Sequence, residues 1–133
     1  MPFTENNGVK IYWEEEGKGA PLLLIMGLGW PSYMWYRTKP LVAEQYRTIT
    51  FDNRGAGRSD VPAGPYSIAA MASDAAAVLD AAGVESAQRI SRSKLVMIPH
   101  ASHIYSTDQP EAAHKSVLEF LSAQNVHSAS GAI

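Results

Sequence analysis

The sequence predicts an α/β fold: a mostly parallel sheet with an antiparallel N-terminal hairpin and helices on both faces. Two observations predict this class. Short apolar or β-branched segments that end at glycines alternate along the chain with segments of helical periodicity. The chain also has 133 residues, the length of one ordinary domain, so residues 1–133 are expected to form a single α/β domain.

Composition and charge exclude several classes of protein. The 11 Lys and Arg against 13 Asp and Glu give a formal net charge of −2, which provides no basic surface for nucleic acid or an anionic membrane. The absence of cysteine excludes thiolate zinc sites and thiol nucleophiles. The longest apolar run, residues 22–30, is too short to span a bilayer, and the N-terminus lacks signal-peptide features. We therefore expect a cytoplasmic protein without a cofactor.

The first half of the chain contains three predicted strands and one helix. Residues 9–14 are β-branched and aromatic with rough alternation, which favours a strand with one exposed face. Residues 21–26 form a continuous apolar run, which predicts a strand buried on both faces. Helical periodicity over residues 34–45 is interrupted by Pro40, so a helix should start or restart there. Residues 46–51 are the next predicted strand.

The second half begins with the clearest helix, over residues 67–82. Ser67 can cap its start, and Gly83 stands where a helix-ending residue belongs. Its apolar face carries Ile68, Met71, Ala75, Val78, Leu79 and Ala82.

A last buried strand is predicted over residues 94–98, and a final helix should open at residues 108–111 with a cap, an early proline and an acidic first turn. Residues 124–133 are small and polar, so this tail is expected to fray. The core stripe of the final helix is formed by Val117, Leu118, Phe120 and Leu121.

Three loops should share the carboxyl edge of this sheet, where ligands bind in α/β folds. They comprise residues 27–33, 52–60 and 99–108. Any chemistry is expected to come from these loops.

At this point the chain resembles a known family. Residues 8–87 resemble the N-terminal half of an α/β-hydrolase of the esterase and enol-lactone hydrolase type. The features that carry the likeness are the apolar run with its glycines at 22–29, a D-x-R-G-x-G-x-S motif at 52–59, and residues 81–84. Residues 94–121 resemble the C-terminal end of that family, where a strand delivers the catalytic histidine. The resemblance implies a shortened α/β-hydrolase sheet that acts on esters or lactones.

The nucleophile of this family is missing from the sequence. The family places its serine in a G-x-S-x-G elbow, followed in the chain by an acid and then the histidine. No G-x-S-x-G occurs in the chain, and Gly57-Arg58-Ser59-Asp60-Val61 lacks the second glycine. The elbow, the acid-bearing strand and the lid are interpreted as absent, with a seam near residues 87–91. The protein is therefore expected to be at best a weak hydrolase.

Six residues are the main candidates for the catalytic machinery. The resemblance gives His103 the role of general base and gives Gly27, Leu28 and Gly29 the oxyanion loop. Ser59 is a candidate hydroxyl, and Asp52 is a candidate to orient His103. The structural alternatives are an exposed loop histidine, glycines that only turn the chain, and a hydrogen-bonded loop serine. Ser102 and Asp108 are weaker candidates, because Ser102 adjoins His103 and Asp108 fits a helix cap.

Neighbouring side chains have less specific roles. Arg54 and Arg58 should tie down their own loop. In the family, the aromatic region beside the oxyanion loop lines an acyl or lactone pocket; the alternative here is that it covers surface left bare by the missing segments. The histidines at 100, 103 and 114 lack the spacing of metal ligands on one helical face, so no metal is expected. The aromatic cluster consists of Trp30, Tyr33, Met34, Trp35 and Tyr36.

The last strand, from Lys94 to Ile98, should lie beside the strand at residues 21–26, giving the order hairpin, 46–51, 21–26, 94–98. It would then be an apolar edge strand, so we expect a homodimer through this edge or a domain swap. Three functions remain open: weak hydrolysis of activated esters, a non-catalytic hydrolase core that folds and self-associates, and binding of a small ester or apolar ligand.

Overall fold

The computed structural model describes residues 3–84 and 110–129. The chain divides into two compact units, residues 1–88 and residues 89–133, each of which is described by itself. The predicted strand at 94–98 and the loop at 99–108, which carries His100, Ser102 and His103, lie outside the described residues. The prediction of one domain over the whole chain stays a prediction.

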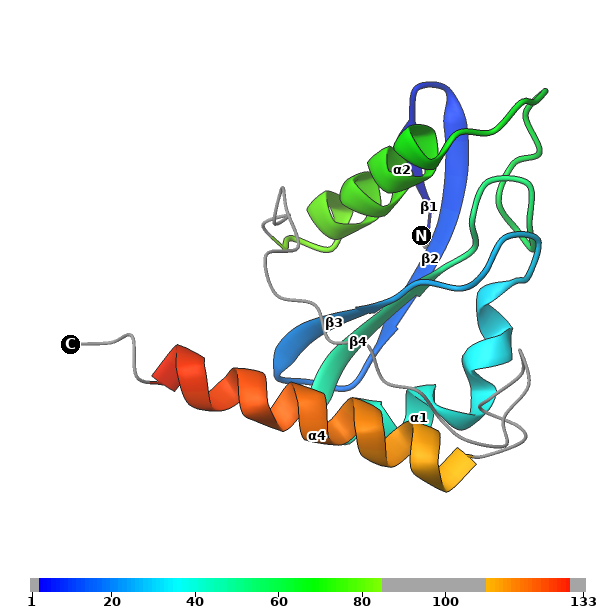
Figure 1. Ribbon diagram of the computed structural model, residues 1–133. Coiled ribbons are helices and arrows are strands. Elements are labelled where there is room, and N and C mark those ends of the chain that lie inside the picture. The colour runs from blue at the N-terminus through cyan, green and yellow to red at the C-terminus, as the bar shows by residue number, and fades with distance from the viewer. Residues whose placement is uncertain (1–2, 85–109, 130–133) are drawn as a thin grey trace. The chain divides into compact units, whose positions relative to one another are not determined.

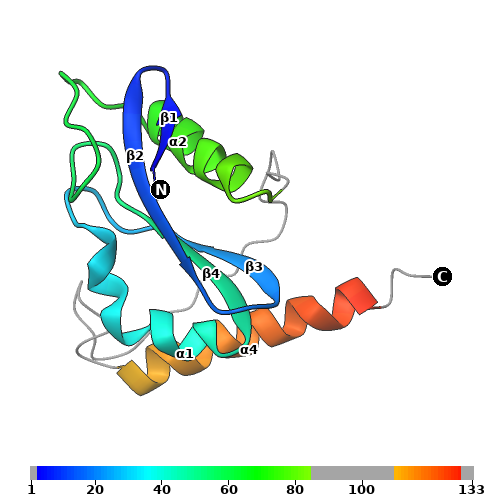
Figure 2. The same ribbon diagram turned by 180° about the vertical axis from the view of Figure 1, so that it is seen from behind.

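The first unit contains a four-stranded mixed sheet (Figures 1 and 2). The strands are β1 (Phe3–Asn6), β2 (Val9–Glu16), β3 (Ala20–Leu24) and β4 (Tyr46–Phe51), in the order β1-β2-β4-β3. β4 lies antiparallel to β2 and parallel to β3, which confirms the predicted order of the described strands. β4 is a central strand, and all but one of its residues are buried, so it lies at the centre of the packing of this unit.

Strands β1 and β2 form the predicted antiparallel N-terminal hairpin, although the bounds of β1 were not predicted. The two strands are joined by a tight turn at Asn7 and Gly8, whose φ angles are 50° and 78°. Two consecutive positive φ values are characteristic of the type I′ hairpin turn, for which Asn-Gly is the strongest sequence signal. The polar character of residues 3–8 concealed the first strand, but the Asn-Gly pair could have located it.

The prediction that residues 21–26 are buried on both faces is wrong. β3 ends at Leu24, its first two residues are exposed, and Ile25 is 57% exposed. Among the described strands β3 has only β4 as a neighbour, so its other edge receives no cover from them. Apolar composition alone did not distinguish a central strand from an edge strand.

Two short helices follow β3. The 3₁₀ helix η1 (Ser32–Arg37) leads into α1 (Lys39–Ala43), which has Pro40 in its first turn, as the predicted restart requires. Lys39 forms ion pairs with Glu14 at 2.7 Å and with Glu16 at 3.6 Å. These pairs place α1 on the face of β2 opposite to the one that carries Val9 and Ile11.

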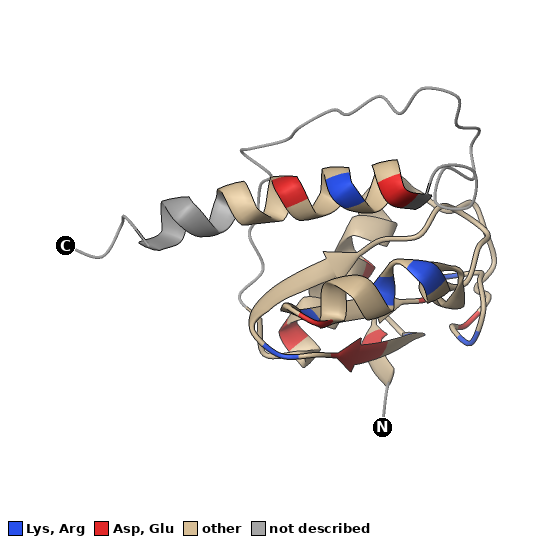
Figure 3. Ribbon diagram, turned by 90° about the horizontal axis from the view of Figure 1, so that it is seen from below, with Lys and Arg blue, Asp and Glu red and all other residues tan. Residues whose placement is uncertain are grey.

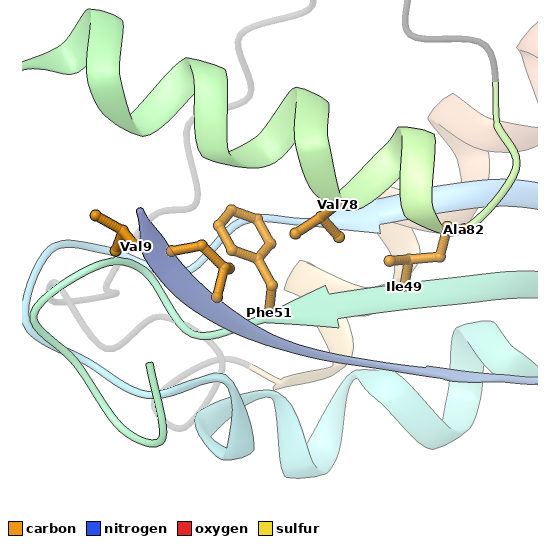
Figure 4. Packing of buried hydrophobic residues seen from close by; sticks show 6 residues of the cluster. Val9, Ile49, Phe51, Val78 and Ala82 are labelled. Carbon is orange, nitrogen blue, oxygen red and sulfur yellow. The ribbon is translucent and has the colours of Figure 1, made fainter. Parts of the chain in front are cut away.

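Helix α2 (Ile68–Ala81) covers that other face of the sheet and confirms the predicted helix. Ser67 Oγ accepts a hydrogen bond from the Ala70 amide at 3.1 Å, and Gly83 follows with φ +68°. Ile68 was predicted to lie on the buried apolar face, but it is 82% exposed, so this part of the prediction is wrong. It lies about 80° around the helix from Val78, beside the buried stripe rather than in it. Figure 4 shows the core between α2 and the strands, built from Val9, Ile11, Ile49, Phe51, Val78 and Ala82.

The second unit contains helix α4 (Pro110–Ala129). Figure 3 shows acidic and basic positions alternating along it, and Lys115 lies 3.8 Å from Glu119. The predicted stripe residues are half-buried, and Ala113 is the buried residue among positions 111–123, for which burial is described. The expected fraying from residue 124 is wrong up to Ala129. This stretch contains good helix formers, and the first helix breaker is Gly131. None of the helices within residues 3–84 and 110–129 has the length and apolarity required to cross a membrane.

Candidate functional site

Asp52 is the first residue of the loop that follows β4, and the hydrogen bonds of the site converge on its carboxylate. Its side chain is 1% exposed, and each carboxylate oxygen accepts a backbone amide. Oδ1 accepts from Ser32 at 2.5 Å, and Oδ2 accepts from Arg58 at 2.8 Å. A Cβ built on Gly57 would lie 2.2 Å from Oδ2, so this position requires glycine. The described contacts of Asp52 are structural, and its predicted orientation of His103 stays a prediction.

Ser59 connects the same loop to strand β2. Its Oγ donates to the Asp52 carbonyl oxygen at 2.6 Å and accepts from the Tyr12 amide at 2.9 Å. The residue is buried, and its hydroxyl proton is already engaged. A serine nucleophile instead needs an adjacent base and access to substrate. The described geometry therefore corresponds to the structural alternative for Ser59.

Asn53 was not singled out from the sequence, yet it holds the candidate oxyanion loop. Its Nδ2 donates to the carbonyl oxygen of Met26 at 2.7 Å. Met26 directly precedes Gly27, and Ser32, bound by Asp52, follows the loop. The available signal for this contact was a polar residue two positions after the predicted strand at 46–51, at the sheet edge where the loops meet.

The loop at residues 27–31 turns at Gly29, which has φ +81°, and the Trp30 amide donates to the Gly27 carbonyl oxygen at 3.2 Å. Leu28 is 67% exposed. The contacts of Asp52 and Asn53 confirm that the loops after β3 and β4 share one edge of the sheet, as expected for parallel strands. The third predicted loop lies outside the described residues.

Arg54 has a different role from the one predicted. It does not tie down its own loop but binds Asp74 on α2 in a bidentate pair, with distances of 2.6 Å and 2.8 Å. Asn6 Nδ2 also donates to Asp74, at 2.7 Å. Asp74 is fully buried, and its hydrogen bonds raise the pKa of Arg54. This cluster joins β1, the loop after β4 and α2.

Arg58 lies at the surface of the site. Its guanidinium carbon is 3.8 Å from the centre of the Tyr12 ring, and its Nε is 3.9 Å from Asp52 Oδ2. Tyr12 donates to Glu14 at 2.7 Å. Burial, followed by this hydrogen bond, raises the pKa of Tyr12, while the bond from Lys39 is the main cause that lowers the pKa of Glu14. Arg58 contacts Asp52 of its own loop through its amide and its guanidinium group, as the predicted role in tying down this loop requires.

The predicted aromatic cluster does not act as one group. Trp30, Tyr33 and Tyr36 are 46%, 62% and 56% exposed, whereas Met34 and Trp35 are half-buried. Trp35 Nε1 is buried and has no hydrogen-bond partner in the described part of the chain. Three members are therefore exposed after the candidate oxyanion loop, whereas Met34 and Trp35 are partly covered.

Comparison with known proteins identifies the family. A family model described as alpha/beta hydrolase fold matches residues 20–88, slightly more than half of the chain. The chain belongs to the α/β-hydrolase family. The matched residues include β3, β4, α2 and both loops of the candidate site described above.

The names of the relatives of this chain describe several different activities. The putative carbamate hydrolase RutD of Azorhizobium caulinodans is 41% identical over 87 residues, which are 65% of this chain and 33% of that protein. A fluoroacetate dehalogenase of a Burkholderia species is 39% identical over 74 residues, 52% of this chain and 24% of that protein.

Solved structures confirm the fold. An N-acyl homoserine lactone degrading enzyme has a TM-score of 0.58 and 43% identity over 62% of this chain and 32% of its own. The enol-lactonase of Burkholderia xenovorans has a TM-score of 0.59 and 26% identity over 62% and 33%. The chain thus spans about a third of the length of these hydrolases, and its four described strands represent part of their fold.

Proposed function

We propose that this chain binds esters or lactones beside the loop at residues 27–31 and hydrolyses activated esters weakly, with His103 as general base on water. The observation that carries the proposal is the glycine loop fixed at both ends, by Asn53 at Met26 and by Asp52 at Ser32. It stands at the carboxyl edge of β3 and β4, where α/β sheets bind their ligands. The lactone-degrading relatives support esters and lactones as the substrate class.

The proposed chemistry is direct hydrolysis. His103 accepts a proton from water while the water oxygen attacks the ester carbonyl carbon. A backbone N–H of the loop stabilises the resulting oxyanion. The intermediate then breaks its bond to the leaving oxygen, which takes the proton back from His103, so that the products are an alcohol and a carboxylic acid. Because the chain has no G-x-S-x-G elbow, it lacks both the family's serine and the oxyanion donor that follows it, so the rate should be low.

Hydrolysis of p-nitrophenyl acetate tests this proposal. The rate above buffer should fall about tenfold or more in His103→Ala, since a positioned general base contributes at least that much. His114→Ala is the matched control, because it removes an imidazole of helix α4 and leaves the proposed base in place. This control is needed because free imidazole groups also react with this ester. Equal rates for the wild type and His103→Ala would contradict the catalytic proposal.

Equal rates would favour a non-catalytic hydrolase core. The specific observation on its side is Ser59, whose hydroxyl is engaged between Asp52 and Tyr12 instead of facing a substrate. Binding of a small apolar ligand would then rest on the exposed rings of Trp30, Tyr33 and Tyr36.

Self-association into a homodimer, through the strand from Lys94 to Ile98 or by a swap, is also a proposal. The exposure of Ile25 and Leu28 at the end of β3 supports it, because monomers rarely leave neighbouring large apolar side chains uncovered. Sedimentation at micromolar concentration should give the mass of a dimer. A monomer under these conditions would refute this part of the proposal.

A further inference from the structure

The loop at residues 27–31 contains little that could hold its own shape. The side chain of Leu28 projects into solvent, Gly27 and Gly29 have none, and a Cβ at either glycine would meet no atom within 4 Å. Within the loop, the hydrogen bond from the Trp30 amide to Gly27 is a 3.2 Å turn contact. An exposed glycine turn of this kind samples many conformations unless its ends are fixed.

Both ends of the loop are fixed by two consecutive residues that directly follow strand β4. Asn53 holds the carbonyl before the loop, and Asp52 holds the amide after it. Asp52 and Asn53 are 1% and 2% exposed, so water does not compete for these contacts. Because the two side chains leave neighbouring positions of one backbone, they set the distance between the loop's ends.

The pair is itself anchored by the rest of the motif. The Asp52 amide donates to the Tyr12 carbonyl at 3.0 Å, and its own carbonyl accepts from Ser59. The Arg58 amide occupies the second carboxylate oxygen. Gly57 supplies the space that this carboxylate needs. The position of the pair therefore depends on β2 and β4, not on the loop that it holds.

We propose that Asp52 and Asn53 are positioning residues that hold the loop at residues 27–31 in one conformation, so that its amides are oriented before a ligand arrives. They do so by fixing the loop's two ends from the start of the loop that follows β4. The functional meaning of this brace rests on the proposed oxyanion role of the loop. The brace itself is a statement about conformation, and it is tested without any measurement of hydrolysis.

Amide hydrogen exchange measured by NMR tests the brace. In Asn53→Asp, which removes the donor, and in Asp52→Asn, which removes an acceptor, the Trp30 amide should exchange about tenfold faster or more. The rate is compared with that of the Ala82 amide, which bonds to Val78 at the end of α2 and reports on the whole unit. Asp60→Asn is the matched control, because Asp60 accepts the Lys10 amide in the same segment without touching the loop.

A third variant keeps the test decisive if those substitutions prevent folding. Ser32→Pro removes the amide that Asp52 binds, at the first position of η1, where proline is tolerated, and after Pro31, whose ψ of 156° suits a following proline. It should accelerate Trp30 exchange as well. Unchanged Trp30 exchange in the folded variants would overturn the brace. Faster exchange without ester hydrolysis in the wild type would leave the brace standing and contradict the proposed function.

Discussion

Replacing Arg54 by methionine should lower the free energy of unfolding by about 3–5 kcal/mol, the range measured when one member of a buried ion pair is removed. The substitution leaves the Asp74 carboxylate, which has 1% of its side chain exposed, with Asn6 as its described partner. A buried charge without its counterion is strongly unfavourable. Urea denaturation of the wild type and the variant measures the difference.

Two further variants separate the pair from its surroundings. In the double variant Arg54→Met/Asp74→Leu both charges are absent, so the loss should be clearly smaller than the sum of the single losses. Lys115→Met breaks the exposed pair with Glu119 and should change stability by less than about 1 kcal/mol. Additive losses in the double variant would show that the two charges do not interact.

Gly57→Ala should be destabilising by about 3–5 kcal/mol. The new Cβ would lie 2.2 Å from Asp52 Oδ2, so the carboxylate must move and lose hydrogen bonds worth about 1.5–3 kcal/mol each. The φ of +55° adds about 1 kcal/mol for a residue with a side chain. Thermal or urea unfolding measures the loss.

Gly83→Ala is the control for this prediction. Its φ is +68°, but a Cβ there would have no atom within 4 Å. It therefore reports the backbone contribution alone, about 1 kcal/mol. Equal losses at Gly57 and Gly83 would mean that the space beside Asp52 does not matter.

Local signals predicted most of the described fold. The strand over residues 46–51 has the predicted bounds, and the capping by Ser67 and the restart at Pro40 follow the expected chemistry. The shared edge of two loops followed from the direction of parallel strands. These features depend on neighbours in sequence or on one general rule of sheet topology.

The remaining features depend on partners that the sequence does not place. Helical periodicity places Asp74 on the same face as Val78, but it does not reveal that the partners of this buried carboxylate are Asn6 and Arg54. The sequence leaves Ser59 as a candidate nucleophile because it does not reveal that the Ser59 hydroxyl accepts the Tyr12 amide, 47 positions away. Burial of β3 was overestimated because composition does not reveal which edge of a sheet is covered.

The contact between Asn6 and Asp74 also bears on how the chain is made. It joins residues 68 positions apart, so the first strand gains this partner only when nearly the whole first unit has been synthesised. Until then the hairpin of β1 and β2 has its type I′ turn but not its polar anchor on α2. Because closing so long a segment is entropically unfavourable, docking of α2 is expected to come late in folding. Strand β1 is therefore synthesised well before the residue that secures it to α2.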